Sequence, residues 1–258
     1  MTRLIGDVAF VTGGAQGIGE AVARRLGATG ATRIAIAGRT LASMERVAHD
    51  LREVGVEVVP CAMDLEDLAS VRAAAKAAEE RFGRIDILVN AAGVTDRGGL
   101  LDTTPETFDR IFNTNVRGNF FLMQAVAAGM VERKSGVIIN ISSILARGGM
   151  THLLPYSASK AALNLITRNA AHTLRFDRVR VHAINLGWTV TPAERATQTG
   201  VHGLPENWDE VEGAKQPFGR LLMPEDPASL CAFLASKDAE MMTGNIIDLE
   251  QWVAGVLG

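Results

Sequence analysis

The sequence predicts an α/β protein with a doubly wound parallel sheet of seven strands and helices on both faces. Three observations lead to this prediction. Short apolar runs alternate with helical stretches, no Pro/Ser-rich linker or repeat interrupts them, and 258 residues suit one α/β core. Because strand–helix–strand units cross over right-handedly, this alternation favours a parallel sheet covered on both sides. We therefore expect residues 1–258 to form a single domain.

The expected strands are short apolar segments that lie near Val8, Ile34, Val58, Leu88, Ile139, His182 and Ile247. The helical stretches that separate them lie around Val22, Val47, Val71, Met123, Leu165 and Leu230. Two of these helices are expected to be long, over residues 104–132 and 156–174. The irregular segment at residues 191–217 is long for a connector, so we expect it to form a lid over a substrate.

The first strand ends in a glycine turn. Residues 7–11, Asp-Val-Ala-Phe-Val, form a short and mainly apolar strand, and residues 12–19 read Thr-Gly-Gly-Ala-Gln-Gly-Ile-Gly before a helical run begins. The turn glycines would allow a tight bend, close approach of a pyrophosphate and close helix packing, in the order Gly13, Gly17 and Gly19. The helix amino terminus adds free N–H groups and a positive dipole. We expect a dinucleotide-binding loop that includes Gln16 and Ile18; glycines needed only for turn geometry are the alternative.

The end of the second strand bears on the choice of cofactor. An Asp there would bind a free ribose 2′-OH, but this chain has Gly38 followed by Arg39. A guanidinium in this place suits a 2′-phosphate and can stack on adenine. We expect NADP(H). NAD(H) is the alternative, because Gln16 puts no second basic residue in the glycine turn and Arg39 would then be a solvated surface charge.

Tyr156, the only tyrosine of the chain, stands four residues before Lys160 at the start of an expected helix. At this spacing the phenol and the ammonium share one face, and the positive charge would lower the pKa of the tyrosine toward neutrality. Ser142 and Ser143 end the apolar strand at residues 137–141, at the sheet edge where ligands bind in α/β proteins. We expect a serine, Tyr156 and Lys160 to meet at one carbonyl and to act in acid–base catalysis; a chance pair on a solvated helix is the alternative.

Together these segments resemble the short-chain dehydrogenase/reductase family, whose single-domain members carry Thr-Gly-x-x-x-Gly-x-Gly, Asn-Ala-Ala-Gly, and a serine thirteen residues before Tyr-x-x-x-Lys. The resemblance covers residues 7–248 and includes Asn90-Ala91-Ala92-Gly93 after an apolar strand. It implies a Rossmann-like fold and a catalytic tetrad of Asn115, Ser143, Tyr156 and Lys160. The thirteen-residue interval favours Ser143 over Ser142.

The resemblance also implies a reversible hydride transfer between NAD(P)(H) and a secondary alcohol or carbonyl. Ser143 would hold the substrate oxygen, Tyr156 would exchange a proton with it, and Lys160 would hold the nicotinamide ribose. Asn115 would hold a water that connects Lys160 to solvent. The other implied cofactor contacts are Asp64 and Leu65 near the adenine, Asn90, Ala91 and Gly93 near a ribose, and Thr189 and Thr191 near the carboxamide and phosphates. A helix-capping role is the alternative for Asp64.

One departure from the family pattern follows the sixth strand. The family usually has Asn-Pro-Gly there, whereas this chain has Asn185-Leu186-Gly187 and then Trp188. Because proline fixes φ and sharpens a turn, its absence is expected to loosen the loop beside the nicotinamide.

The substrate residues expected from position are Ser143, His152, Tyr156 and Trp188, with Leu145, Arg147, Leu153, Leu154 and Trp208 around them. His, Arg and Trp side chains suit a sugar or polyol, which presents C–H faces and hydroxyl edges, although each could simply pack in the fold. The alternative substrates are small ketones or 3-oxoacyl thioesters. A catalytically idle sensor or scaffold that binds a dinucleotide is a further alternative, which the intact tetrad disfavours.

Charge and composition exclude several other classes. The chain has 26 basic and 29 acidic residues in mixed order, so it offers no basic face to nucleic acid or to an anionic membrane. Cys61 and Cys231 suit reduced core thiols, and the five histidines lack metal-ligand spacing, so no metal site is expected. No apolar run approaches the roughly 18 residues of a membrane span, and the first is too short for a signal peptide. We expect a cytoplasmic protein.

The expected partners are a small-molecule substrate and further copies of the chain. Both long helices carry apolar residues on more than one face, including Phe120 and Leu165, and thereby resemble the dimerising helices of the family. An apolar tail at residues 246–253 would form a second subunit contact. Together these two surfaces predict a homotetramer, a dimer of dimers.

Overall fold

A single parallel sheet organises the computed structural model, which describes residues 3–253. Its strand order is β3-β2-β1-β4-β5-β6-β7, and every neighbouring pair is parallel. The strands are β1 (Val8–Thr12), β2 (Arg33–Gly38), β3 (Glu57–Ala62), β4 (Ile87–Asn90), β5 (Gly136–Ser143), β6 (Val179–Leu186) and β7 (Ile246–Leu249). All seven expected strands are confirmed.

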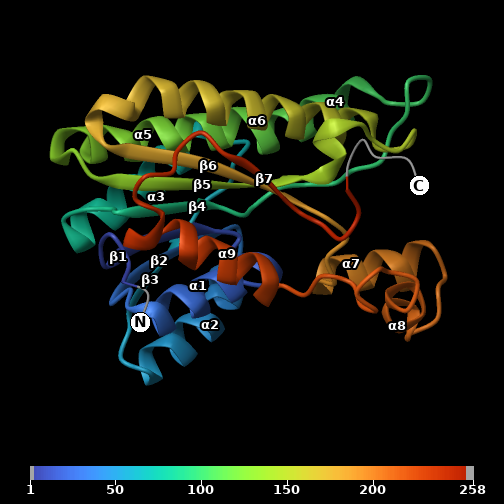
Figure 1. The fold of residues 1–258 in the computed structure, drawn as a ribbon, viewed down its shortest axis with the longest axis horizontal. Coiled ribbons are helices and arrows are strands. Elements are labelled where there is room, and N and C mark those ends of the chain that lie inside the picture. Colours follow the sequence, from blue (N-terminus) through green and yellow to red (C-terminus); the bar gives the residue numbers. More distant parts are fainter. Residues whose placement is uncertain (1–2, 254–258) are drawn as a thin grey trace.

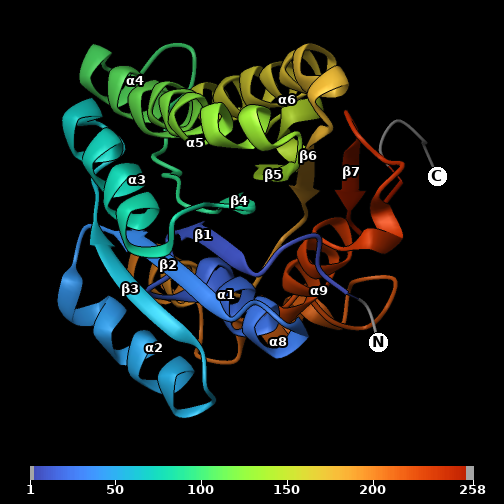
Figure 2. The same cartoon turned by 90° about the vertical axis from the view of Figure 1, so that its left-hand side faces the viewer.

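Helices cover both faces of the sheet (Figures 1 and 2). One face carries α1 (Gly17–Thr29), α2 (Leu41–Glu53) and α9 (Glu225–Leu234). The other carries α3 (Leu68–Phe82), α4 (Pro105–Phe112), α5 (Asn119–Arg133) and α6 (Leu154–Leu174). Two short helices, α7 (Pro192–Ala196) and α8 (Trp208–Gly213), lie together beyond one end of the sheet. The doubly wound α/β fold expected from the sequence is confirmed.

The apolar core is divided by the sheet into two halves, because successive strand residues point to opposite faces. In β1, Ala9 and Val11 pack with α1, whereas Val8 and Phe10 pack with the opposite helices. All five β1 residues are buried, as expected for a strand covered on both sides. This packing fixes the strand ends from which the site is built.

The long helix expected over residues 104–132 is interrupted. A π-helical turn, η1 (Asn113–Gly118), separates α4 from α5. The buried side-chain amide of Asn119 holds this turn by donating to the backbone oxygens of Thr114 (3.3 Å) and Asn115 (3.0 Å). π turns occur mainly at functional sites. This one carries Asn115.

The segment expected to be an irregular lid is a small folded unit. It contains α7, a π turn at Thr197–Val201 and α8, and its own cluster of buried residues consists of Val190, Trp208 and Leu221. The far end of this unit is tied to the carboxyl-terminal segment, since Gln251 donates to the Arg220 oxygen (2.6 Å) and Trp252 to the Gln216 side chain (2.9 Å). Residues 191–217 are therefore folded even though their sequence shows no clear period.

Two simple features concern the whole described chain. Within residues 3–253, no helix has the length and apolarity of a membrane span.

Both cysteines are buried free thiols, and burial raises the pKa of Cys61 to about 11 and that of Cys231 to about 12. They are inert core residues, as the sequence predicts.

Candidate active site

The site lies where the strand order reverses. β1 pairs with β2 on one side and with β4 on the other, so the chains that leave β1 and β4 turn to opposite faces and leave a crevice at their carboxyl ends. Ligands of open α/β sheets bind at such a switch point. The glycine turn after β1 and the Asn-Ala-Ala-Gly segment after β4 meet here.

The glycine turn has the geometry of a phosphate-binding loop. Gly13 and Gly17 have positive φ angles of 67° and 56°, which side chains with a Cβ rarely adopt. A Cβ on Gly19 would lie 2.3 Å from the Gly13 oxygen, so the first turn of α1 packs directly on the loop. Gln16 does not cap α1 with its side chain, which leaves the first N–H groups of the helix to a ligand or solvent. These donors and the bare backbone fit a pyrophosphate.

Thr12, for which the sequence predicted no role, connects the turn after β1 with the segment after β4. Its hydroxyl accepts hydrogen bonds from the backbone N–H groups of Ala91 (3.0 Å) and Ala92 (2.9 Å). The turn after β1 is thereby fixed against the segment after β4. The signal was present in the sequence, because a buried threonine that ends a strand before a glycine needs a hydrogen-bond partner.

The Asn90 side chain is engaged within the sheet, and its expected place near a ribose stays a prediction. It is buried in the sheet, and its side chain donates to the Asn140 side chain at 2.8 Å, while Asn140 donates to Thr167 at 2.9 Å. Asn90 and Asn140 are register partners of β4 and β5, so their side chains share one face of the sheet. The Asn90 side chain therefore holds the two strands together, and the cofactor contacts expected of Asn90, Ala91 and Gly93 stay predictions.

The contacts expected near the adenine are of two kinds. Asp64 uses one carboxylate oxygen to accept the N–H of Glu66 at 3.0 Å, a local turn contact, whereas Asp67 caps α3, so the helix-capping alternative for Asp64 is wrong. Leu65 is buried among core residues, and its carbonyl faces Gly118, where a Cβ would lie 2.2 Å away. Any contact from Leu65 to a cofactor would have to come from its backbone.

The two serines at the end of β5 have different partners. Ser142 donates to the backbone oxygen of Lys160 at 3.3 Å. Ser143 lies on the other side, where its hydroxyl accepts from the Leu145 N–H at 3.2 Å and is near enough to Tyr156 to lower the pKa of the phenol. The structure therefore brings Ser143 and Tyr156 together, in agreement with the thirteen-residue interval.

Lys160 is buried one helical turn beyond Tyr156. Its ammonium donates to the Ile141 backbone oxygen at 2.9 Å and lies 5.7 Å from the centre of the Tyr156 ring. Burial lowers the pKa of Lys160 to about 8, so the side chain still carries its charge at neutral pH. A buried cation beside a phenol and a serine hydroxyl is the arrangement of an acid–base site.

The pKa of Tyr156 differs from the expectation. Burial raises it to about 12, the hydrogen bond from Ser143 lowers it, and the negative charge of Glu194 raises it further. In the chain alone, loss of water outweighs the favourable effect expected from Lys160. The phenol is therefore protonated at neutral pH, which suits a proton donor.

We predict that Lys160→Met stabilises the fold at neutral pH. A shift of the Lys160 pKa from 10.5 to about 8 corresponds to a folding cost on the order of 3 kcal/mol below pH 8. Loss of the hydrogen bond to Ile141 offsets about 1 kcal/mol of this gain. Thermal unfolding at pH 7 should therefore give a Tm about 5 °C above wild type.

The pH dependence tests the cause of this stabilisation. As the pH rises from about 8 toward 10.5, Lys160 loses its proton in the folded chain before it does in the unfolded chain. The unfolded state then binds more protons, so wild-type stability rises and the advantage of the variant shrinks. Lys76→Met, at an exposed lysine of α3, is the control and should not change this pH dependence. An advantage of Lys160→Met that is constant with pH would contradict the explanation.

Asn115 positions other groups in the site. Its side-chain amide donates to the Val94 oxygen (2.9 Å) and to the Ser159 hydroxyl (3.1 Å), and its oxygen accepts from the Val94 N–H (2.9 Å). Ser159 donates in turn to the Tyr156 backbone oxygen. The structure thus links Asn115 to the turn at Tyr156 through Ser159. The Asn115 side chain, which was expected to hold a water, forms its hydrogen bonds with other residues of the chain.

The expected substrate residues divide into two groups. Trp188 is 37% exposed, stacks on Trp208 at a centroid distance of 5.3 Å, and donates to the Glu194 side chain at 2.7 Å. Trp208 is fully buried beneath it, so the expectation that Trp208 faces substrate is wrong. His152 is exposed, and its segment pairs with Gly98. Glu194 was not predicted from the sequence, because its place beside Trp188 depends on how residues 190–221 fold together.

The Asn185-Leu186-Gly187 loop, which lacks the family's proline, is held by pairing with β7. Leu186 pairs with Leu249 in β7, and Gly187 donates to the Leu249 oxygen at 3.0 Å. Thr189 forms a bridge with Leu222 and turns its hydroxyl to the Gly187 oxygen, whereas Thr191 lies 3.5 Å from a Cβ placed on Gly17. Of the two threonines, Thr191 is the one brought to the glycine turn.

The side chains expected to select the cofactor lie at the outer end of the crevice. Arg39 is exposed after β2, and Gln16 is exposed on the glycine turn. A hollow of about 470 Å³ beside the glycine turn is lined by Ala15, Gln16, Glu20, Ala42, Ser43, Arg46 and Pro192. Arg46 was not singled out in the sequence, because nothing in α2 shows that this side chain reaches back to the glycine turn. Among residues 3–253, no three His, Cys, Asp or Glu side chains gather as metal ligands.

Comparison with known proteins gives one consistent result. The chain matches the short chain dehydrogenase family over residues 7–201. It is 34% identical over 255 residues to a galactitol 2-dehydrogenase of Agrobacterium fabrum, covering 96% of this chain and 97% of that relative. It is 32% identical over 250 residues to a 3-oxoacyl-[acyl-carrier-protein] reductase of Thermotoga maritima, covering 96% and 98%. The structure of an L-sorbose reductase from Gluconobacter frateurii, complexed with NADPH and L-sorbose, superposes with a TM-score of 0.93 at 27% identity over 99% of both chains.

Proposed function

The chain belongs to the short-chain dehydrogenase/reductase family, and from this premise we propose that it is an NADP(H)-dependent oxidoreductase that interconverts a secondary alcohol and its carbonyl, with a sugar or polyol as substrate. The observation that carries the proposal is the meeting of Ser143, Tyr156 and buried Lys160 beside a glycine turn built for a pyrophosphate. An idle scaffold would not need a buried cation in this place, because burial makes Lys160 costly to the fold.

The chain's own groups have separate tasks in this reaction. The bound dinucleotide supplies the hydride donor or acceptor; the glycine turn, Ala91, Gly93 and Thr191 would hold it. Ser143 would donate a hydrogen bond to the substrate oxygen and stabilise charge that develops there. Tyr156 would give a proton to that oxygen in reduction and take it back in oxidation. The positive charge of Lys160, 5.7 Å from the Tyr156 ring centre, would favour the phenolate left behind.

The cofactor preference rests on Arg39. The slot that would hold an Asp for a ribose 2′-OH is Gly38, and the next residue is an exposed guanidinium. An exposed arginine can turn to a 2′-phosphate and form charge-assisted hydrogen bonds with it. This supports NADP(H) over NAD(H).

The substrate proposal rests on Trp188 and Glu194. An indole held flat against Trp208 offers an apolar face, and the carboxylate beside it offers an acceptor for hydroxyl groups. Sugars and polyols present both kinds of surface. The activities named for two relatives, on galactitol and on L-sorbose, have the same chemistry. Small ketones and 3-oxoacyl thioesters are the second candidate class, named by the Thermotoga relative.

A substrate panel followed by NADPH absorbance tests this function. The panel contains L-sorbose and D-fructose as polyhydroxy ketones, cyclohexanone as a plain ketone, and an acetoacetyl thioester. We expect reduction of a polyhydroxy ketone with kcat/KM at least about tenfold above cyclohexanone, because hydroxyl groups that pair with a fixed carboxylate add binding energy. Preference for the thioester would replace the sugar proposal, and no turnover on any member despite cofactor binding would favour the idle scaffold.

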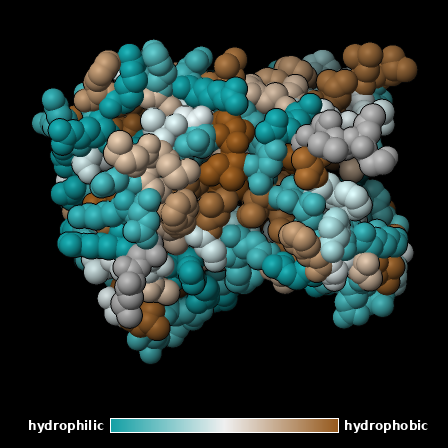
Figure 3. Space-filling model, viewed as in Figure 1, coloured by the Kyte–Doolittle hydropathy of each residue, from teal (hydrophilic) through white to brown (hydrophobic). Residues whose placement is uncertain are grey.

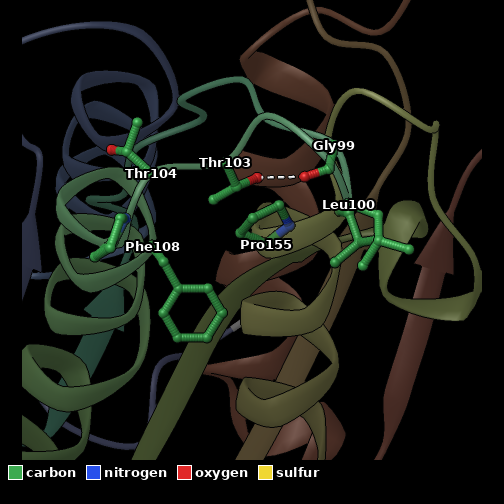
Figure 4. Close-up of a pocket in the computed structure, with 8 residues that line it drawn as sticks. Gly99, Leu100, Thr103, Thr104, Phe108 and Pro155 are labelled. Atoms are coloured by element: carbon green, nitrogen blue, oxygen red, sulfur yellow. Dashed lines mark hydrogen bonds between the residues drawn. The ribbon is translucent and has the colours of Figure 1, made fainter.

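We also propose that the protein is a homotetramer with a lid at residues 191–217. Exposed apolar residues support the first part: Phe120 on α5 and Leu165 on α6 are 42% and 60% exposed. Figure 3 shows apolar surface around the edge strand β7, whose four residues are all half-buried. Figure 4 shows a further apolar hollow at the start of α6, where Phe108, Pro155 and Leu100 face one space. Sedimentation as a monomer at micromolar concentration would contradict the assembly.

A further inference from the structure

A second guanidinium stands at the outer end of the crevice, in addition to Arg39. Arg46 belongs to α2, but its side chain reaches the glycine turn and donates to the Ala15 backbone oxygen at 3.2 Å. It lines the same hollow as Gln16 and Ser43. Its charge therefore lies next to the part of the turn where the sequence showed no basic residue.

Arg46 is held in this place by Glu20. Two of its nitrogens donate to the two Glu20 carboxylate oxygens, at 3.1 and 2.6 Å. Burial by itself would raise the pKa of Glu20, but hydrogen bonds from Arg46 and Arg24 lower it overall, so the carboxylate is ionised. The hollow thus contains a fixed pair of opposite charges, and the Arg46 side chain remains 55% exposed to any ligand that enters.

The pair has a direct consequence for a phosphate group. Without Arg46, Glu20 would keep its bonds from Arg24 to one carboxylate oxygen, but the other oxygen, which accepts only from Arg46 at 2.6 Å, would lose its partner and repel an anion. With Arg46 in place, the negative charge of Glu20 is balanced by the guanidinium. An arginine has five N–H donors, so Arg46 keeps donors beyond those that bond to Glu20 and Ala15. Arg39 follows the end of β2 but does not line this hollow, so Arg46 is the guanidinium that an anion in the hollow would meet.

We propose that Arg46 is the second basic residue that selects NADP(H), supplied by α2 instead of the glycine turn, and that Glu20 positions it while reducing its pull on the 2′-phosphate. The inference rests on the proposed function, because it assigns the 2′-phosphate end of the same cofactor site. It goes beyond the role proposed for Arg39, since it predicts that the Glu20 carboxylate on α1 limits the preference for NADPH over NADH. A purely structural pair that only ties α1 to α2 is the competing explanation.

The test is equilibrium binding of NADPH and NADH, followed by the fluorescence of the reduced nicotinamide, to the full-length wild type and to Arg46→Met. We expect NADPH binding to weaken about tenfold and NADH binding to change by less than about twofold, because only NADPH carries the 2′-phosphate. Arg52→Met is the matched control: it removes a guanidinium of the same helix that pairs with Glu45 at 2.9 Å. It should leave both affinities unchanged.

Glu20→Gln gives the opposite prediction. Removing this carboxylate while keeping its shape should tighten NADPH binding about threefold and leave NADH binding unchanged. The double variant Glu20→Gln with Arg46→Met should bind NADPH less tightly than Glu20→Gln alone, which separates direct contact from simple neutralisation. Circular dichroism and Tm show whether each variant is folded.

Each outcome decides between the explanations. Equal weakening of NADPH and NADH by Arg46→Met, or no change in either, would overturn the inference and leave a structural pair. If Glu20→Gln and the double variant bind NADPH equally, Arg46 acts only by balancing the charge of Glu20, and the proposed contact with the 2′-phosphate is wrong. If the wild type binds neither dinucleotide, the proposed function itself has failed.

Discussion

Tyr156→Phe is expected to lower kcat about a thousandfold and to leave the Kd of NADPH within about twofold of wild type. The variant keeps the ring that packs beside Lys160 and removes only the hydroxyl that meets Ser143. A positioned proton donor typically contributes a factor of 10² to 10⁴, so its loss should appear almost entirely in the chemical step. Binding should persist because the glycine turn is untouched.

The measurement is steady-state kinetics on the best substrate of the panel, with NADPH binding measured in parallel. Because Tyr156 is the only tyrosine, loss of the tyrosine contribution to the ultraviolet absorption spectrum confirms the substitution. The control is Tm, which should change little, since the lost hydroxyl makes one hydrogen bond of about 1 kcal/mol. Turnover within tenfold of wild type would show that another group delivers the proton.

Gly19→Ala is expected to weaken dinucleotide binding at least a hundredfold. The added Cβ would lie 2.3 Å from the Gly13 oxygen and 2.8 Å from the Thr12 oxygen. Both are backbone atoms, so the helix and the turn must move apart instead of one side chain turning away. That movement would displace the N–H groups and the positive end of α1 from the pyrophosphate.

The control for this substitution is Gly129→Ala. An alanine there would meet mainly the flexible end of the Arg133 side chain, and it lies within α5, where alanine favours the helix. Binding should be unchanged and Tm equal or higher. If Gly19→Ala binds NADPH as wild type does while Tm falls, the turn would matter for folding only, and the cofactor would have to bind elsewhere.

The sequence predicted the sheet well because strands covered on both faces are nearly continuous apolar runs. It predicted Ser143 from an interval and the glycine turn from spacing. The π turn at Asn113–Gly118 could not be predicted in this way, since it depends on the Asn119 amide reaching backbone oxygens of the preceding turn. The same holds for the lid unit, whose core joins residues far apart in the chain, Val190 and Leu221.

Side-chain environments were harder to predict than positions. Asn90 was placed in the correct segment, yet its side chain pairs with Asn140 because β4 and β5 bring them into register. The pKa of Tyr156 rises to about 12 because burial outweighs the neighbouring charge, and the depth of burial cannot be read from a four-residue spacing. Arg46 could not be predicted from the sequence, because its partner Glu20 lies on another helix.

Equilibrium binding of NADPH to the wild-type protein tests the central claim most directly. We predict saturable binding of NADPH that enhances nicotinamide fluorescence and is tighter than that of NADH. Gly19→Ala should weaken it at least about a hundredfold, and Tyr156→Phe should retain it. Absence of binding by both dinucleotides in a folded wild-type protein would contradict the claim that the turn after β1 and the Tyr156 site form one cofactor-dependent active site.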